Sequence, residues 1–212
     1  MKKRCVAFLL TALLLCQPLL GLAEETAAAL QTEDRVGERG GASFSLPQFG
    51  EEPEINQYYL DLAVRLEAGE LPPGAAWSAD DDGSEPENWV LDYEITRNDA
   101  EYVSIVLHLR QLAGSGEVET LSADTFVRGE SSRRITLSEL LGAEAVDGDT
   151  KTADLVYELI WEIVQVGMEN VEGDYLDRLE LDSVRSALDP ETDFYLDENG
   201  NIVFFVEPGL LA

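Results

Sequence analysis

Regular alternation of apolar and polar residues between positions 89 and 128 is the feature that most constrains how this chain can fold. Apolar residues occupy the odd-numbered positions of 89–96 and of most of 101–110. A period of two is typical of a strand that packs one face and exposes the other to water. Turn signals separate these segments from each other and from a third strand at 118–128. Short connections predict an antiparallel meander, which continues to a brief strand at 135–137.

Two longer segments instead repeat apolar residues every three or four positions, which is the spacing of one helix face. The first is 54–68, where Pro53 suits the first helical position and Gly69 suits the end. The second is 152–171, where one narrow polar stripe interrupts a largely apolar sequence. A helix with so narrow a polar face should be covered over most of its circumference, so we expect it to lie across the sheet. The stripe consists of Asp154, Glu158, Glu162, Gln165 and Glu169.

The remaining elements are short. One helical turn is expected at 138–142, and a polar helix is expected within 174–188. The segments 194–196 and 202–206 are strand-like, and the Asn-Gly pair between them is a strong hairpin signal. The elements predict an α+β fold, in which an antiparallel sheet made of the meander and the C-terminal hairpin is packed by two or three helices.

The first 23 residues have the pattern of a secretory signal peptide. Three basic residues precede an apolar run at 5–20, and small residues at 21 and 23 suit cleavage after Ala23. The alternative is a retained membrane anchor, although the run is short for a span and Pro18 interrupts it. Residues 24–43 lack aromatic side chains and predict a disordered tether before a single domain at 44–212. We therefore expect a secreted or cell-envelope-associated protein.

Acidic residues far outnumber basic ones, which disfavours several classes of partner. The chain has 43 Asp and Glu against 14 Lys and Arg, a net charge of −29, and loss of three basic residues with the signal changes −29 to −32. Phosphate backbones and anionic membrane surfaces attract basic proteins, so nucleic acid and membrane binding are not expected. Both cysteines lie within the predicted signal, so the mature domain would contain no disulfide.

Few residues suit catalysis or metal binding. His108 is the only histidine, and no nucleophile motif accompanies it, so we interpret it as a structural or surface residue. The acidic run at 80–85 suggests a calcium loop, but with Gly83 at position six of an EF-hand, Trp89 stands where a bidentate glutamate is needed. We predict no catalytic residue, no metal site and no cofactor.

The acidic segment between two tryptophans is the best candidate for contact with another protein. Aromatic anchors beside carboxylates suit the recognition of a basic partner. The alternative is a solvated loop flanked by one core tryptophan. The candidate binding residues are Trp77, Asp80, Asp81, Asp82, Glu85, Glu87 and Trp89.

Seven short segments follow one another in a recognisable order: Pro47-Gln48-Phe49, Ile55-Asn56-Gln57, Tyr102-Val103-Ser104-Ile105, Thr125-Phe126-Val127, Ile135 to Leu141, Phe194-Tyr195-Leu196 and Asn199 to Phe205. In this order and spacing they resemble the extracellular domain shared by the RsiV anti-sigma factor and the N-terminal region of the peptidoglycan deacetylase PdaC. The similarity covers about 44–208. The resemblance implies an exported bacterial α+β domain, which in RsiV-like proteins receives lysozyme.

The chain departs from both kinds of relative. Four residues precede the apolar run, which leaves no room there for a sigma-binding segment, and no deacetylase domain follows. Neither sigma regulation nor deacetylation is carried over, and no lysozyme-contacting residue is transferred. The expected protein is a stand-alone, non-catalytic binding or sensor domain, with a cationic protein such as lysozyme as candidate ligand. The alternatives are a peptidoglycan- or glycan-binding accessory module and an uncharacterised cell-wall hydrolase.

Overall fold

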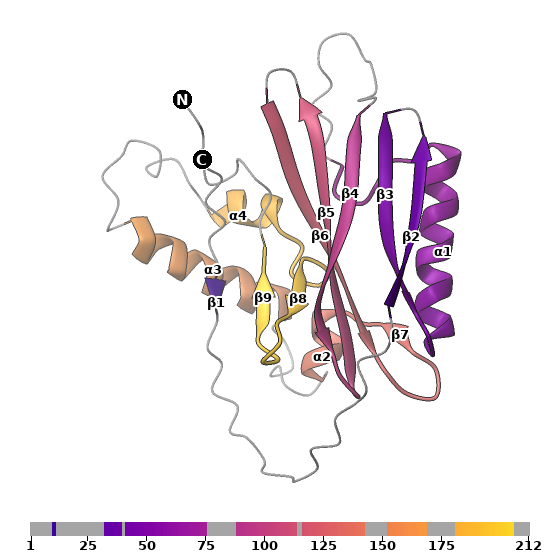
Figure 1. Ribbon diagram of the computed structural model, residues 1–212. Coiled ribbons are helices and arrows are strands. Elements are labelled where there is room, and N and C mark those ends of the chain that lie inside the picture. Colours follow the sequence, from indigo (N-terminus) through magenta and orange to yellow (C-terminus); the bar gives the residue numbers. More distant parts are fainter. Residues whose placement is uncertain are drawn as a thin grey trace.

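A six-stranded sheet forms the centre of the molecule, with helix α1 on one side and the C-terminal elements on the other (Figure 1). The computed structural model describes residues 10–11, 32–39, 41–75, 88–113, 116–142, 152–168 and 181–205. The strands are β1 (Leu10–Thr11), β2 (Thr32–Arg39), β3 (Ala42–Phe49), β4 (Trp89–Asn98), β5 (Tyr102–Ala113), β6 (Gly116–Val127), β7 (Arg133–Arg134), β8 (Phe194–Leu196) and β9 (Ile202–Phe204). The helices are α1 (Pro53–Ala68), α2 (Leu137–Leu141), α3 (Thr152–Met168) and α4 (Leu181–Ala187).

The large sheet has the order β2-β3-β4-β5-β6-β7 and is mixed. The meander β4 to β7 is antiparallel throughout, as predicted. Strands β3 and β4 are parallel, pairing Ser43 with Val90 and Phe44 with Leu91, so the prediction of a wholly antiparallel sheet is wrong at this pair. The reason is that α1 connects them as a crossover, and a crossover returns the chain in the same direction.

Strand β2 lies inside the segment 24–43 that was predicted to be a tether. It pairs antiparallel with β3 along its whole length, and β3 itself begins at Ala42. The structure therefore differs from the prediction at residues 32–39, whereas 24–31 lie outside the described residues. Charged residues dominate β2, and its strand geometry comes from pairing with β3 rather than from an apolar pattern of its own.

Helix α1 begins and ends where the sequence predicts. Pro53 lies in its first turn, and Gly69 adopts a left-handed conformation with φ of 94° just beyond its end. The N–H of Gly69 bonds to the carbonyl of Leu66 at 3.0 Å, which satisfies a carbonyl of the last turn. At the other end, the Asn56 amide bonds to both main-chain groups of Phe49 at 2.6 and 2.7 Å, which holds β3 against the helix.

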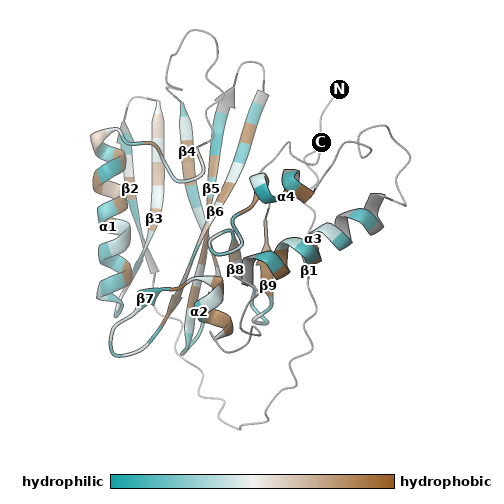
Figure 2. Ribbon diagram, turned by 180° about the vertical axis from the view of Figure 1, so that it is seen from behind, coloured by the Kyte–Doolittle hydropathy of each residue, from teal (hydrophilic) through white to brown (hydrophobic). Residues whose placement is uncertain are grey.

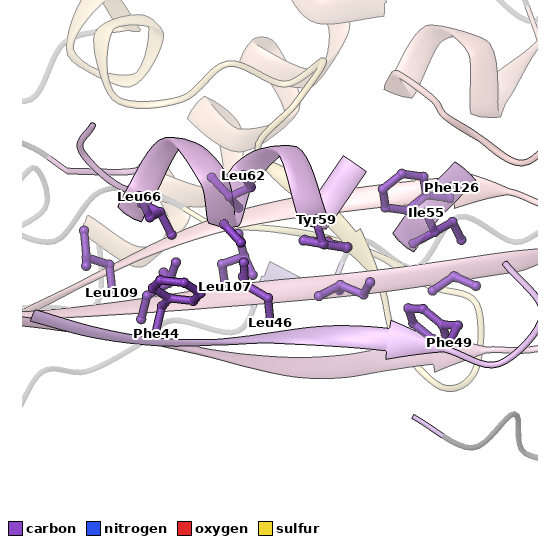
Figure 3. Packing of buried hydrophobic residues seen from close by; sticks show 14 of the residues in the cluster. Phe44, Leu46, Phe49, Ile55, Tyr59, Leu62, Leu66, Leu107, Leu109 and Phe126 are labelled. Atoms are coloured by element: carbon purple, nitrogen blue, oxygen red, sulfur yellow. The ribbon is translucent and has the colours of Figure 1, made fainter. Parts of the chain in front are cut away.

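The first hydrophobic core lies between α1 and the sheet (Figure 3). The apolar stripe of α1 faces the odd-numbered side chains of β4 and β5, so the alternation recognised in the sequence corresponds to the packed face. The residues of this core include Phe44, Leu46, Phe49, Ile55, Tyr59, Leu62, Leu66, Trp89, Leu91, Val103, Ile105, Leu107, Leu109 and Phe126. Helix α1, rather than 152–171, is thus the helix that covers the sheet.

Helix α3 belongs to a second core on the opposite side. Its Val156 and Ile160 pack with Phe194 and Phe204 of the C-terminal hairpin, and the helix contacts α2 and α4. The prediction that it lies across the sheet is wrong. Leu155 is 45% exposed, so this apolar helix is covered on less of its circumference than the narrow polar stripe suggested. Figure 2 shows α3 and α4 on the side of the strands opposite α1.

The C-terminal hairpin forms at the predicted place but in a different sheet. Strand β8 pairs with β9, and the turn places Gly200 at φ of 82°. The hairpin belongs to a small sheet of order β1-β9-β8, in which Leu10, from the predicted signal segment, pairs with Phe204. The predicted strand at 135–137 is replaced by β7 and the start of α2, because Thr136 and Glu139 form a capping box at Leu137. None of the helices over the described ranges is both long enough and apolar enough to cross a membrane.

Candidate binding surface

Of the seven candidate binding residues predicted from the sequence, the structure describes only Trp89. Trp77, Asp80, Asp81, Asp82, Glu85 and Glu87 lie outside the described residues. Trp89 begins β4 and is 8% exposed, packed into the first core. Its indole therefore stabilises the sheet and is not free to anchor a partner, which agrees with the alternative of one core tryptophan at this loop.

The sheet face opposite α1 is divided between a buried part and a polar part. The buried part lies under the hairpin, where the N–H of Leu196 donates to Ser104 Oγ at 3.0 Å and this hydroxyl lies 2.9 Å from Thr125 Oγ1. Beyond the hairpin, charged side chains from β4, β5 and β6 share the same face. We call this set the polar face; it consists of Asp92, Glu94, His108, Arg110, Glu117 and Glu119.

Strand register brings the polar face together. Asp92 is directly opposite His108, and Arg110 is directly opposite Glu119. These residues occupy the positions between the buried residues of the first core, so the alternation that builds that core also gathers the charges on the other face. The alternation predicted which face of β4 is exposed to water, but the cross-strand neighbours depend on the register.

His108 is flanked by carboxylates from both neighbouring strands. Its Nδ1 lies 3.1 Å from Glu119 Oε1, and its Nε2 lies 3.7 Å from Glu94 Oε2. The Arg110 guanidinium pairs with Asp92 on the same face. The carboxylates exceed the basic groups here, so the polar face carries net negative charge. Such a face can attract a cationic group but offers little chemistry beyond electrostatic attraction and hydrogen bonding.

A second cluster, which the sequence analysis missed, is buried on the α1 side of the sheet. Asp124 of β6 accepts hydrogen bonds from the hydroxyls of Tyr58 at 2.9 Å and Tyr59 at 3.1 Å. Arg134 Nε lies 2.7 Å from Asp124 Oδ1. A signal existed, because Asp124 has the same strand parity as the core residue Phe126, where an apolar side chain is expected.

Burial sets the proton affinities in this cluster. Removal from water raises the pKa of Asp124 above its ordinary value, although Arg134 and the two tyrosines act in the opposite direction. The pKa of Tyr58 and that of Tyr59 are raised mainly by burial and further by the nearby Asp124 carboxyl. The cluster ties α1 to the far edge of the sheet, and since Asp124 and Tyr59 are buried we interpret it as structural.

Another buried charge pair holds the start of α1. Glu52 Oε1 lies 2.7 Å from Arg128 Nε, and Glu52 Oε2 accepts a hydrogen bond from Ser132 at 2.6 Å. The Arg128 guanidinium also reaches Asn98 Oδ1 at 2.7 Å. One arginine thus joins three connections of the chain. These are the connection before α1, the one between β4 and β5, and the one after β6.

Among the described residues, no group of three or more His, Cys, Asp or Glu side chains is arranged to hold a metal ion. The acidic run at 80–85 is outside that set. A scan against models of protein families and a search of the curated proteins each found no match for this chain.

Proposed function

We propose that this chain is an exported, non-catalytic binding domain of the bacterial cell envelope whose ligand is a cationic protein, with lysozyme as the first ligand to test. The proposal rests on the excess of carboxylates and on the way the arginines are used. With 43 acidic residues against 14 basic ones, carboxylates outnumber cationic side chains about threefold.

The arginines supporting this argument are already engaged internally. Each lies within ion-pair distance of a carboxylate, so its charge is balanced locally and the remaining carboxylates carry the net negative charge. They are Arg65, Arg97, Arg110, Arg128, Arg133, Arg134 and Arg185. A surface of this kind speeds association with a basic protein, and the effect weakens as salt screens it.

Calorimetry tests the proposal. The protein is titrated with hen lysozyme and with cytochrome c, a basic protein of similar size, at about 20 mM and about 150 mM NaCl, where the screening length falls to about 8 Å. A specific receptor should retain saturable binding to lysozyme at the higher salt and lose cytochrome c. Loss of both at the higher salt would reduce the interaction to general charge attraction and remove the specific proposal.

Two alternatives are separated by parallel measurements. Sedimentation with purified peptidoglycan would favour a glycan-binding module. Release of soluble fragments from the same peptidoglycan would instead favour a hydrolase.

A further inference from the structure

The outer edge of β6 is only partly paired. Strand β7 pairs with β6 at Phe126 and Val127, and the N–H of Ile135 donates to the carbonyl of Thr125 at 2.9 Å. Consecutive strand residues direct their main-chain groups alternately to the two sides, and the β5–β6 register is unbroken. The N–H and C=O groups of Glu117, Glu119 and Leu121 therefore face the same outer side as those of Thr125. Among the described residues no strand pairs with them.

The pairing stops because the chain leaves the edge to form α2. The capping box of Thr136 and Glu139 begins that helix at Leu137, so β7 cannot continue along β6. Farther along, the backbone at Gly74 passes beside Leu121, since a Cβ at Gly74 would lie 3.3 Å from the Leu121 carbonyl oxygen. The Gly74 backbone therefore covers the edge at Leu121, and we call the stretch Glu117–Thr120 before this contact the open edge.

Charged and unsatisfied side chains flank the open edge. Glu117 and Glu119 are exposed on the polar face. On the other face, the Thr120 side chain is 5% exposed and its hydroxyl has no hydrogen-bond partner.

The chain itself shows which kind of segment this edge accepts. Strand β7 is the pair Arg133–Arg134, and Arg134 bonds through its guanidinium to the Ala123 carbonyl at 3.2 Å while it pairs with Asp124. A short basic strand thus already satisfies main-chain and carboxylate groups of β6. The open edge shares the outward main-chain groups, and its carboxylates, Glu117 and Glu119, are exposed on the polar face rather than buried on the α1 side as Asp124 is.

We propose that the open edge binds an extended, lysine- or arginine-bearing segment of a partner protein by β-augmentation. The inference rests on the proposed function and specifies how the cationic partner is held. Main-chain hydrogen bonds to Glu117 and Glu119 supply the register, and basic side chains directly across from these glutamates supply the selectivity.

A peptide binding experiment tests the inference with the full protein. The probe is a labelled nine-residue peptide that alternates lysine with threonine or valine, measured by fluorescence anisotropy at about 150 mM NaCl. The Glu117→Gln/Glu119→Gln variant should weaken binding about tenfold, or about 1.4 kcal/mol, because it removes two cross-strand ion pairs. The matched control, Glu158→Gln/Glu162→Gln on exposed positions of α3, makes the same change in charge elsewhere and should bind as the unmodified protein does.

Three measurements on the main chain distinguish strand pairing from electrostatic attraction. The same peptide N-methylated at alternate amides should lose binding, and hydrogen exchange at the amides of Glu117 and Glu119 should slow when the unmodified peptide binds. Glu119→Pro should weaken binding more than Glu119→Gln, because proline removes an outward N–H that an edge strand does not need for folding.

Several results would overturn the inference. Equal weakening by the α3 control, or undiminished binding of the N-methylated peptide, would mean that net charge alone attracts the probe. Specific lysozyme binding without any peptide binding would reject the edge while leaving the proposed function intact. If lysozyme does not bind but the peptide still slows hydrogen exchange at the amides of Glu117 and Glu119, lysozyme is rejected as the ligand. The inference about the open edge then stands.

Discussion

Asp124 is a carboxylate in the core, and three side chains from two distant parts of the chain converge on it. Tyr58 and Tyr59 approach from α1, and Arg134 approaches from β7. A buried carboxylate persists only when its oxygens are satisfied, and here both oxygens accept hydrogen bonds. These hydrogen bonds and the ion pair join α1 to the sheet. Substitutions in the cluster should therefore change the free energy of unfolding rather than the affinity for a ligand.

Replacing Asp124 by asparagine should destabilise the fold by about 2 kcal/mol at pH 7, because one tyrosine hydroxyl loses its acceptor and Arg134 loses its partner. Urea unfolding measures the effect. The exposed Glu67→Gln on the solvent side of α1 is the control and should change the unfolding free energy by less than about 0.5 kcal/mol. Equal stability of the two variants would show that the cluster does not fasten α1.

The buried tyrosines predict a loss of stability at alkaline pH. Their folded-state pKa values are raised above the ordinary 10.0, so the folded chain keeps phenolic protons that the unfolded chain releases. Their stabilising contribution is complete below about pH 10 and is lost as the pH rises towards the folded-state values, at about 1.4 kcal/mol per pH unit for each tyrosine.

Urea unfolding between pH 9 and 11.5 tests this dependence. Tyr58→Phe should be less stable than the unmodified protein at pH 7 but should lose stability less steeply above pH 10, since one titrating group is gone. Parallel curves for the two proteins would contradict the assignment of the slope to this cluster.

At the scale of elements, helix α1 and the C-terminal hairpin occupy opposite faces of the same strands. Helix α1 is docked through a continuous apolar stripe. The hairpin is docked differently, through the fully buried Ser104 hydroxyl, which links Thr125 of β6 to the main chain of Leu196 in β8. The attachment of the hairpin therefore depends on one polar contact as well as on packing.

Ser104→Ala should weaken this attachment. The buried N–H of Leu196 would lose its acceptor, which costs about 1–2 kcal/mol in unfolding free energy. Hydrogen exchange should quicken at Leu196 more than at Leu62 in the middle of α1, which serves as the internal control. A uniform change across both elements would mean that the hairpin and the large sheet open as one unit.

At the scale of the whole molecule, the surplus of negative charge opposes compaction. Repulsion among exposed carboxylates destabilises the folded state, and dissolved ions screen it. The ion pairs within the chain, such as Arg110 with Asp92, are local and largely exposed, so their weakening by salt is the smaller effect.

Raising NaCl from about 20 to about 300 mM should therefore raise the melting temperature by about 2–4 °C, equivalent to roughly 1 kcal/mol for a domain of this size. Differential scanning calorimetry measures the shift. Potassium chloride at the same concentration should act equally, because screening depends on ionic strength. A lower melting temperature at high salt would show that the internal ion pairs outweigh the repulsion.

The sequence by itself determined where several helices and strands lie and which of their faces are buried. Pro53 and Gly69 marked both ends of α1, the alternation at 89–110 marked two strands and their buried face, and the Asn199-Gly200 pair marked the hairpin. Each of these signals depends on interactions within a few residues of the chain, so it can be recognised without knowing the neighbours in space.

Only the tertiary structure decided which surfaces meet. The apolar character of α3 could not reveal that it would pack on the hairpin while α1 took the sheet, because hydrophobic attraction is non-directional and either helix could bury its face there. The charged β2 became a strand through pairing with β3, and Asp124 entered the core because Tyr58, Tyr59 and Arg134 satisfy it. The open edge of β6 likewise exists because the chain turns into α2 after β7 and no longer pairs with β6. This outcome depends on contacts between segments that are distant in the sequence, which no local pattern predicts.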